Sequence, residues 1–349
     1  MLSFGKKSRC LSNFRPNPKQ LYSAWNCRCD ATEVLRTKYE KSDISQYQLP
    51  PVQPGFRTNV GKTGEIFTKD HPYFSNTPPT VAKQLSQIAE DAAAAGLPPD
   101  VEQHVAKGST QKQRAVLDQL LRENPRLTRP EAKQLLDSVS EHIHGILATG
   151  HPHLALGGYK SIDEQYDVFR KVLKDRFKTQ FDRTIKSGGV YNPPLRARVE
   201  EHMFGYEKKL DPAKRPVYGY LTTVNKNGVA TQHPEWYGDL GIRLKPGVTK
   251  RATLTAGDSL NLQYVPGKTT KPGAHVFIAE GEMRQVSTKL EQLSKAKHID
   301  DLRYNYVELQ FHGGLSASAI ESVAVPYLRG VPLDILEECK RLGITVIEK

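Results

Sequence analysis

The sequence lacks several features that would place it in a familiar class of protein. No stretch of its 349 residues approaches the roughly 18 uninterrupted apolar residues of a membrane-spanning helix, so we expect no membrane span. Its four cysteines, at positions 10, 27, 29 and 339, form no CxxC pair and no disulfide framework, which favours free thiols in a reducing compartment. P-loop, GxSxG, HExxH and GxGxxG strings are also absent. A recognisable kinase, hydrolase or dehydrogenase is therefore excluded.

Acidic residues are missing from the first part of the chain. Residues 1–29 contain six Lys or Arg and no Asp or Glu, and residues 30–80 are rich in Pro, Gly, Asn and Thr without an apolar period. We predict a disordered basic arm and linker over residues 1–79. The net charge of +12 permits attraction to nucleic acid, anionic lipid or a polyphosphate ligand, and chooses none of them.

Helical periodicity begins near residue 80 and continues to about residue 205. Apolar residues recur at helical spacing over residues 81–92 and again after Ser109, which we predict to cap a helix. Thr128, followed by Arg-Pro-Glu, predicts the start of a helix that ends near residue 147. A further amphipathic stretch runs from residue 162 to about residue 185. We therefore predict a helical region over residues 80–205.

Short runs of strand-forming residues replace this pattern from residue 206 onward. We predict strands at residues 217–224, 238–244, 253–255, 275–279, 306–312 and 322–325. A helix over residues 332–343, closed by Gly343, and a terminal strand over residues 344–347 follow. The predicted fold class is α+β, with the helical N-terminal region beside a strand-rich core formed by residues 206–349.

Four histidines form a cluster that could suggest a metal site: His142, His144, His151 and His153. Positions two apart on a helix point to different sides, so the first pair cannot bind one ion unless the helix has already ended. No cysteine or acid completes a zinc-binding spacing nearby. We therefore expect no metal.

Three strand-rich segments carry polar side chains that could form one site. They contain Arg215, then Thr253 and Thr255, then Glu308. Residues two apart on a strand share a face, so the two threonines point the same way, as do Tyr306, Glu308 and Gln310. An arginine provides a planar fork for a pyrophosphate, and a carboxylate can bind a ribose hydroxyl while positive charge develops at the anomeric carbon. This combination suits a ligand that carries both phosphate and sugar.

The order of these residues resembles the Arg-Ser-Glu class of mono-ADP-ribosyltransferases, which cleave NAD at the nicotinamide bond. The resemblance implies a split β-sheet core in which Arg215 holds the NAD phosphates, Thr253 and Thr255 hold the site in place, and Glu308 is the catalytic carboxylate. Tyr306 stands where enzymes that modify arginine have Glu or Gln, which favours a hydroxyl as the acceptor. Threonine also replaces serine on the middle strand.

A second resemblance covers roughly residues 155–330 and rests on a spaced series of motifs. The segments Gln180-Phe-Asp182, Arg215-Pro-x-Tyr218-Gly219, Thr253-x-Thr-x-Gly-Asp258-Ser259 and Gln310-x-His312-Gly313 are similar to a bacterial family of unknown function and to bacterial effectors that ADP-ribosylate ubiquitin on a threonine. The likeness departs at Asp182-Arg183, where that family tends to have Glu-Thr. Besides Arg215, it implies NAD contacts at Tyr218, Gly219, Thr253, Thr255, Asp258, Ser259 and Gln310, with Thr253 also among the catalytic residues. It implies acceptor contacts at Tyr306 and Gln180.

The same resemblance implies a setting for the protein. It would be a monomeric virulence protein, secreted from a bacterium into the host cell cytoplasm, where it blocks ubiquitin signalling. Residues 80–205 would recognise the target or form a lobe of the catalytic domain. No nucleic acid partner is then expected.

Two alternatives stay open on the sequence. The first is an NAD glycohydrolase toxin that uses the same site with water as the acceptor. The second is a non-enzymatic protein whose basic arm, with Phe4, Phe14, Tyr22 and Trp25 among its cations, binds nucleic acid or an anionic membrane.

Overall fold

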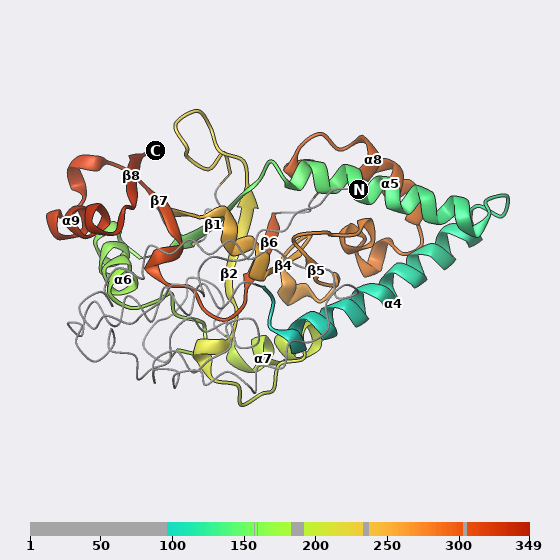
Figure 1. Cartoon of the computed structure of the whole chain (residues 1–349), viewed down its shortest axis with the longest axis horizontal. Helices are drawn as coiled ribbons and strands as arrows, with labels where there is room; N and C mark the ends of the chain where they lie inside the picture. Colours follow the sequence, from blue (N-terminus) through green and yellow to red (C-terminus); the bar gives the residue numbers. More distant parts are fainter. Residues whose placement is uncertain (1–95, 157, 159, 183–191, 233–236, 303–305) are drawn as a thin grey trace, which may run out of the picture. The chain divides into compact units, whose positions relative to one another are not determined.

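A computed structural model describes residues 96–349 except 157, 159, 183–191, 233–236 and 303–305. Contacts divide the chain into two units, residues 1–53 and 54–349, and the described residues all belong to the second unit. The arm predicted over residues 1–79 and the helix predicted over residues 81–92 lie outside the described residues. Figure 1 labels the described α-helices and most of the strands as they are named below.

Two long helices open the described part of the chain. Helix α4 (Pro99–Glu123) has a proline in its first turn beside Asp100 and Glu102, which complement the positive end of the helix dipole. Ser109 lies inside α4 and does not cap a helix, so that prediction was wrong. Helix α5 (Arg129–Leu147) starts with a capping box between Thr128 and Glu131, which confirms the predicted start and end. The two helices pack against each other and against α8 (Val286–Lys295).

Helix α6 (Ile162–Lys174) begins at a second capping box, between Ser161 and Glu164. It ends eleven residues before the predicted limit of 185, because the next residues join the sheet region instead. Arg176 forms an isolated β-bridge with Ser316, and the Phe177 backbone N–H donates to the Leu315 carbonyl at 2.8 Å. The predicted helix was therefore too long.

The other α-helices of the described residues are α7 (Pro193–Phe204) and α9 (Leu333–Leu342). Asn192 caps the start of α7, and Gly205 ends it with a φ of 73°, a left-handed conformation that favours glycine. The α9 helix is the one predicted over residues 332–343, and Gly343 ends it with a φ of 69°. Cys339 on α9 is a buried free thiol. None of the helices described between residues 96 and 349 is both long and apolar enough to cross a membrane.

Several short 3₁₀-helices connect these elements. One of them replaces the strand predicted over residues 275–279: backbone bonds from Val276 to Gly273 and from Ile278 to His275 wind this segment into a turn. A short buried apolar run does not distinguish a strand from a buried turn, which explains the error. The turns are η4 (Pro212–Lys214), η6 (Pro246–Arg251), η7 (Ser259–Asn261), η8 (Ala274–Phe277), η9 (Glu280–Glu282), η10 (Ile299–Leu302), η11 (Ala317–Ala319) and η12 (Leu328–Gly330).

The described strands form one mixed sheet of eight strands in the order β5-β4-β6-β2-β1-β3-β7-β8. All neighbours are antiparallel except β7 and β8, which run parallel. The chain is thus a mixed α and β protein, and that the core is of the ADP-ribosyltransferase kind stays a prediction. The strands are β1 (His151–Leu156), β2 (Val217–Thr222), β3 (Leu240–Leu244), β4 (Ala252–Thr255), β5 (Gly267–Lys268), β6 (Val307–Phe311), β7 (Ile320–Val325) and β8 (Thr345–Glu348).

Strand β1 and the two-residue strand β5 are the parts of the sheet that the sequence analysis did not predict. Strand β1 lies between β2 and β3, at the centre of the strand order. Its residues belong to the predicted helical region 80–205, whereas the other strands belong to residues 206–349. The two regions therefore share one sheet.

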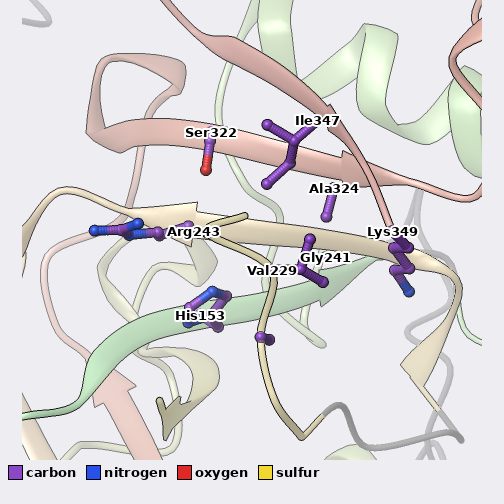
Figure 2. Close-up of a pocket in the computed structure, with 10 residues that line it drawn as sticks. His153, Val229, Gly241, Arg243, Ser322, Ala324, Ile347 and Lys349 are labelled. Carbon is purple, nitrogen blue, oxygen red and sulfur yellow. The ribbon is translucent and has the colours of Figure 1, made fainter. Parts of the chain in front are cut away.

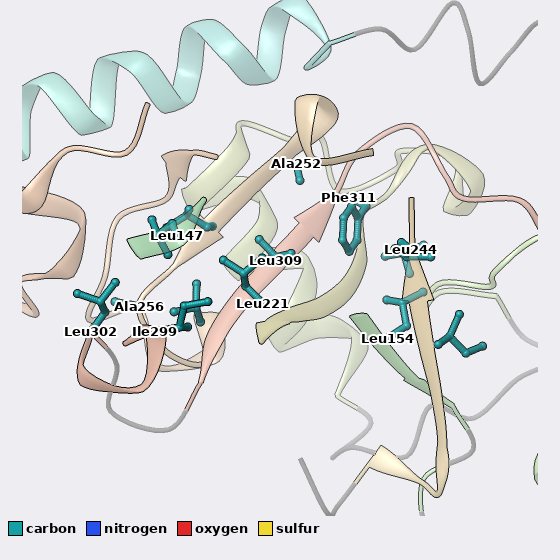
Figure 3. Close-up of a cluster of buried hydrophobic side chains, with 14 of the residues drawn as sticks. Leu147, Leu154, Leu221, Leu244, Ala252, Ala256, Ile299, Leu302, Leu309 and Phe311 are labelled. Atoms are coloured by element: carbon teal, nitrogen blue, oxygen red, sulfur yellow. The ribbon is translucent and has the colours of Figure 1, made fainter. Parts of the chain in front are cut away.

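One face of the central strands is apolar and forms part of the main core. Leu221 on β2, Leu309 and Phe311 on β6, and Ala252 on β4 gather in one cluster with Leu147 at the end of α5 (Figure 3). Leu309 and Phe311 have no exposed surface. Burial of this face provides the hydrophobic free energy that holds β4, β6 and β2 in register.

Candidate functional site

The opposite face of the same strands is polar. Thr253 pairs with Gln310 and Thr255 pairs with Glu308 across β4 and β6, and Tyr218 pairs with Gln310 across β2 and β6. Directly paired residues of antiparallel strands point to the same side of the sheet. The structure therefore brings these five residues together on one face, as the alternation in the sequence predicted for the members of each strand.

A hydrogen-bond network fixes this polar face. The Thr253 hydroxyl donates to Gln310 Oε1 at 2.7 Å, and Gln310 Nε2 donates to Thr255 Oγ1 at 3.0 Å. The same Nε2 donates to Glu308 Oε1 at 2.8 Å. The threonines thus orient the amide of Gln310, and the amide in turn orients the carboxylate of Glu308. Gln310 is the link through which the Thr-x-Thr strand acts on Glu308.

Glu308 is 3% exposed, and its carboxylate has further polar neighbours. Tyr306 donates its hydroxyl to Glu308 Oε2 at 3.2 Å, and a hydrogen bond from Ser259 also reaches the carboxylate. Burial raises the pKa of Glu308 and the Asp258 charge adds to the rise, while Arg196, Ser259 and Gln310 oppose it. The net effect is a carboxyl group whose pKa lies above its ordinary value.

Tyr306 connects the carboxylate to a second tyrosine. Its hydroxyl oxygen lies 3.3 Å from the hydroxyl oxygen of Tyr237, and the two rings meet edge to face. Burial raises the pKa of both phenols, so both carry their protons at neutral pH. Tyr306, predicted to contact the acceptor, therefore lies beside Glu308, and Tyr237 is a neighbour that the sequence analysis did not assign to the site.

Arg215 lies next to this face and is 1% exposed. Its Nη1 donates to Glu200 Oε2 at 2.6 Å, and its Nη2 donates to the carbonyl oxygens of Glu207 and Lys208 at 3.1 and 2.9 Å. The guanidinium also stacks over Phe181, 3.9 Å from the ring centroid. Both ends of the fork are thus engaged within the protein, so a phosphate at Arg215 would have to exchange with these partners.

Glu200 belongs to α7 and binds two of the site residues. Besides Arg215, it accepts a hydrogen bond from the Tyr218 hydroxyl at 2.9 Å. Burial raises the pKa of Glu200, and the Arg215 guanidinium acts against that rise. The ion pair and the tyrosine together tie α7 to the start of β2.

Arg196 is a second charged residue of α7 at this site and was not predicted. Its Nη1 donates to Ser259 Oγ at 2.9 Å and its Nε donates to Gln180 Oε1 at 3.3 Å. Its guanidinium carbon lies 4.1 Å above the centroid of the Tyr218 ring. The predicted residues Gln180, Ser259 and Tyr218 therefore meet around this arginine.

The helical spacing of Arg196 and Glu200 was the signal that could have found them. They lie four residues apart, on the buried stripe of α7 that also contains Val199 and Met203. Charged residues on the apolar stripe of a helix are rarely buried without a specific partner. Such a stripe therefore indicates that the helix covers a polar site.

Of the two further predicted NAD contacts, Gly219 lies away from the polar face, whereas the charge of Asp258 acts on Glu308. Gly219 pairs with Leu309, so it lies on the apolar face, and a Cβ atom there would be 2.4 Å from the carbonyl oxygen of His153. The glycine therefore serves strand packing, away from the polar face. Asp258 is half-buried and accepts a hydrogen bond from the Leu260 backbone N–H at 2.9 Å, which caps η7 beside Ser259.

His312 extends the network at the end of β6. Its Nε2 lies 3.0 Å from Thr253 Oγ1 and its Nδ1 lies 2.7 Å from the Tyr206 hydroxyl. The ring also meets Phe204 edge to face, with centroids 4.9 Å apart. Burial lowers the pKa of His312 to about 3, so the ring is neutral near pH 7. It supports the threonine and adds no charge.

The histidine cluster does not assemble around one point. His142 Nε2 lies 2.7 Å from the carbonyl oxygen of Ala296, and His144 is exposed on the same helix. His153 on β1 is buried and stacks on Tyr220 with ring centroids 5.7 Å apart. Among the residues that the structure describes, no group of three or more His, Cys, Asp or Glu side chains could hold a metal ion.

A pocket opens farther along the polar side of the sheet (Figure 2). His153 pairs with both Tyr220 and Arg243, and Tyr220 pairs with Glu308, so the pocket and the carboxylate share one face. The space measures about 370 Å³ and includes open solvent. Its lining comes from β1, β3, β7, β8 and the segment 228–230, with Arg243 and Lys349 as the cations.

Comparison with known proteins does not indicate what this site does. No protein-family model matches the chain. The Gene 2 protein of Mycobacterium phage L5 is 28% identical over 157 residues, which are 42% of this chain and 57% of the phage protein. The matched part thus spans little more than half of that relative, and its name states no activity.

Proposed function

We propose that the protein is an NAD-dependent mono-ADP-ribosyltransferase. The observation that carries the proposal is the buried carboxylate of Glu308, held on the polar face by Gln310, Tyr306 and Ser259. A carboxylate fixed in this way can accept a hydrogen bond from a ribose hydroxyl. It also stabilises the positive charge that develops at the anomeric carbon when nicotinamide leaves, because its orientation is set before the reaction begins.

The reaction has a simple balance of bonds. The bond between the ribose C1′ and the nicotinamide nitrogen breaks, and its electron pair leaves with the nicotinamide. The acceptor oxygen then forms the new bond to C1′ and gives up its proton. The chain supplies binding, orientation and a fixed negative charge, and NAD is consumed as a substrate.

The neighbourhood of Glu308 supports a hydroxyl acceptor. Tyr306 and Tyr237 place two phenol hydroxyls beside the carboxylate, where an acidic or amide side chain would receive an arginine. The acceptor class proposed here is therefore serine or threonine, and the proposed target, which rests on the sequence resemblance alone, is a threonine of ubiquitin. On the same basis we propose a bacterial effector that is secreted into the host cytoplasm and blocks ubiquitin signalling there.

Arg215 enters the proposal through its buried ion pair. The pair with Glu200 fixes α7 over the polar face, which brings Arg196 to Ser259. Direct contact between Arg215 and the NAD phosphates requires the Glu200 carboxylate to give way to the pyrophosphate, which offers the same negative charge to the same fork.

The test is incubation of the purified full chain with a tagged NAD analogue, alone, with ubiquitin and with a eukaryotic lysate. Glu308→Gln is the inactive variant, and Glu337→Gln, at an exposed position on α9, is the matched control. We expect a labelled protein band with the wild type and the control and none with Glu308→Gln. Mass analysis of the band identifies the acceptor.

Other outcomes separate the alternatives. Free ADP-ribose without a labelled band would identify an NAD glycohydrolase that uses water as the acceptor. Intact NAD under every condition would contradict the proposal that the protein is an enzyme. Binding of nucleic acid or anionic vesicles that disappears when residues 1–79 are removed would then identify the basic arm as the functional part.

A further inference from the structure

Arg196 is buried without an ion pair. Its side chain is 4% exposed, and no carboxylate lies within salt-bridge distance of it among the residues that the structure describes. Its two polar contacts are neutral, the Ser259 hydroxyl and the Gln180 amide oxygen. A buried guanidinium without a salt-bridge partner costs folding free energy, so its retention points to a use other than stability.

The contacts of Arg196 lead directly to Glu308. Arg196 Nη1 donates to Ser259 Oγ, which leaves the hydroxyl hydrogen of Ser259 free to point at the Glu308 carboxylate. The Tyr218 ring lies under the guanidinium and fixes its plane. Because Tyr218 and Glu308 stand on neighbouring strands of the polar face, the arginine is held within electrostatic reach of the carboxylate.

The other groups that face Glu308 cannot take over this role. Gln310 on β6 and Tyr306, which precedes that strand, are neutral donors, and Tyr218 on β2 and Tyr237 are neutral phenols. Asp258 before η7 is an acid whose charge disfavours a second negative charge nearby, and Glu200 on α7 is paired with Arg215. Arg196 provides the positive charge that opposes Asp258.

We propose that Arg196 is a positioning residue that orients the Glu308 carboxylate through Ser259 and keeps it ionised. The proposal rests on the proposed function, in which ionised Glu308 binds the ribose and stabilises the transition state. It adds a specific division of labour between the arginines: Arg215 anchors α7, and Arg196 on that helix controls the charge of the carboxylate.

The experiment follows the titration of Glu308 directly in the full chain. Glutamate carboxyl carbons are labelled with ¹³C, and the Glu308 signal is identified by its loss in Glu308→Gln. The variants are Arg196→Gln, Arg196→Lys and Ser259→Ala, with Arg198→Gln, an exposed arginine of the same helix, as the matched control. NAD consumption is measured over the same pH range.

We expect Arg196→Gln to raise the titration midpoint of Glu308 by about 1 pH unit or more, because an opposite charge at this range lowers a carboxyl pKa by that order. The acidic limb of the pH profile for kcat should move with it, with KM for NAD little changed. Arg196→Lys keeps the charge without the fork and should shift the midpoint less, and Ser259→Ala should shift it upward as well. Arg198→Gln should leave it unchanged.

An unchanged Glu308 midpoint in a folded Arg196→Gln protein would overturn the proposal. If Arg196→Gln does not fold, Arg196→Lys and Ser259→Ala provide the test. A Glu308 titration midpoint that is unchanged in both of these variants would also overturn the proposal. The carboxyl titration does not depend on catalysis. A wild type that consumes no NAD would therefore refute the proposed function while the role of Arg196 in ionising Glu308 is still measured.

Discussion

The two faces of strands β4 and β6 are built from alternate residues of the same segments and are equally buried. On one face Leu254, Leu309 and Phe311 are at most 1% exposed, and on the other Thr253 and Gln310 have no exposed surface. The apolar face gains free energy from leaving water, whereas every polar group on the opposite face must replace its lost water contacts with protein partners. Equal burial thus serves stability on one face and a positioned carboxylate on the other.

The polar face lowers the stability of the folded protein through the charge that it buries. Burial raises the pKa of Glu308, which means that its ionised form is less favourable in the folded protein than in the unfolded chain. A protein that needed only a stable sheet would gain from an apolar residue there. The comparison of the two faces therefore makes separate predictions for stability and for activity.

The largest effect on stability should come from the apolar face. Phe311→Ala removes a fully buried ring from the main core and should lower the free energy of unfolding by about 3–5 kcal/mol. Urea denaturation of the full chain measures the loss. A cost below about 1 kcal/mol would mean that the core beneath β6 is not packed as described.

The buried ion pair gives the next effect, because it joins a helix to the polar face. Arg215→Met leaves the Glu200 carboxylate buried without its cation and should cost about 3–5 kcal/mol, whereas the double variant Arg215→Met/Glu200→Leu should cost clearly less. The exposed pair Arg129–Asp118 is the control, and Arg129→Met should change stability little. Equal costs for the single and double variants would contradict the coupling.

The pH dependence of the free energy of unfolding should also show that the polar face contains buried titratable groups. Burial lowers the pKa of His312 from 6.5 to about 3, so between these values the unfolded chain binds a proton that the folded protein does not. Stability from this group is complete above pH 6.5 and is lost as the pH falls toward 3, with a slope of about 1.4 kcal/mol per pH unit. His275, whose pKa burial lowers to about 4, adds to the same loss.

His312→Gln should reduce this acid slope, and His144→Gln, on the exposed side of α5, should leave it unchanged. Urea denaturation at several pH values between about 3.5 and 7 measures both slopes. This pH range follows from the pKa values of the two buried histidines. An unchanged slope in His312→Gln would show that the ring is not buried in its neutral form.

The smallest effect should come from a single hydroxyl of the network. Thr253→Val keeps the shape and strand preference of the side chain but leaves Gln310 Oε1 without its donor, so it should cost about 1–3 kcal/mol. Thermal and urea denaturation measure it, and Thr110→Val at an exposed site of α4 is the control. A variant as stable as the wild type would show that Gln310 finds another donor.

Local sequence signals were sufficient for part of this architecture. The capping residues of α5, the glycine that ends α9 and the alternation on β6 each depend on neighbouring residues, and they were predicted correctly. The length of α6 was not, because tertiary bonds of Arg176 and Phe177 to the 315–316 segment draw the chain away from the helix. No local pattern contains those partners.

Strand β1 escaped prediction because it contains Pro152, which argues against a central strand. The structure tolerates it because the pairing of β1 with β3 begins only at His153, so the proline pairs on one side with Leu221 of β2. The set of candidate site residues was partly predictable for a similar reason. Residues on one strand share a face by geometry, whereas Arg196 and Glu200 reach the site from a helix whose placement no short spacing encodes.

The central claim is that the polar face around Glu308 is a catalytic site maintained at a cost to stability. The most direct test measures NAD cleavage and the free energy of unfolding on the same preparations of wild type and Glu308→Gln. The account predicts that cleavage falls by about 10²–10³-fold while stability at neutral pH stays equal or rises, because the variant no longer ionises a buried carboxyl group. Undiminished cleavage, or a loss of cleavage that only follows unfolding, would contradict it.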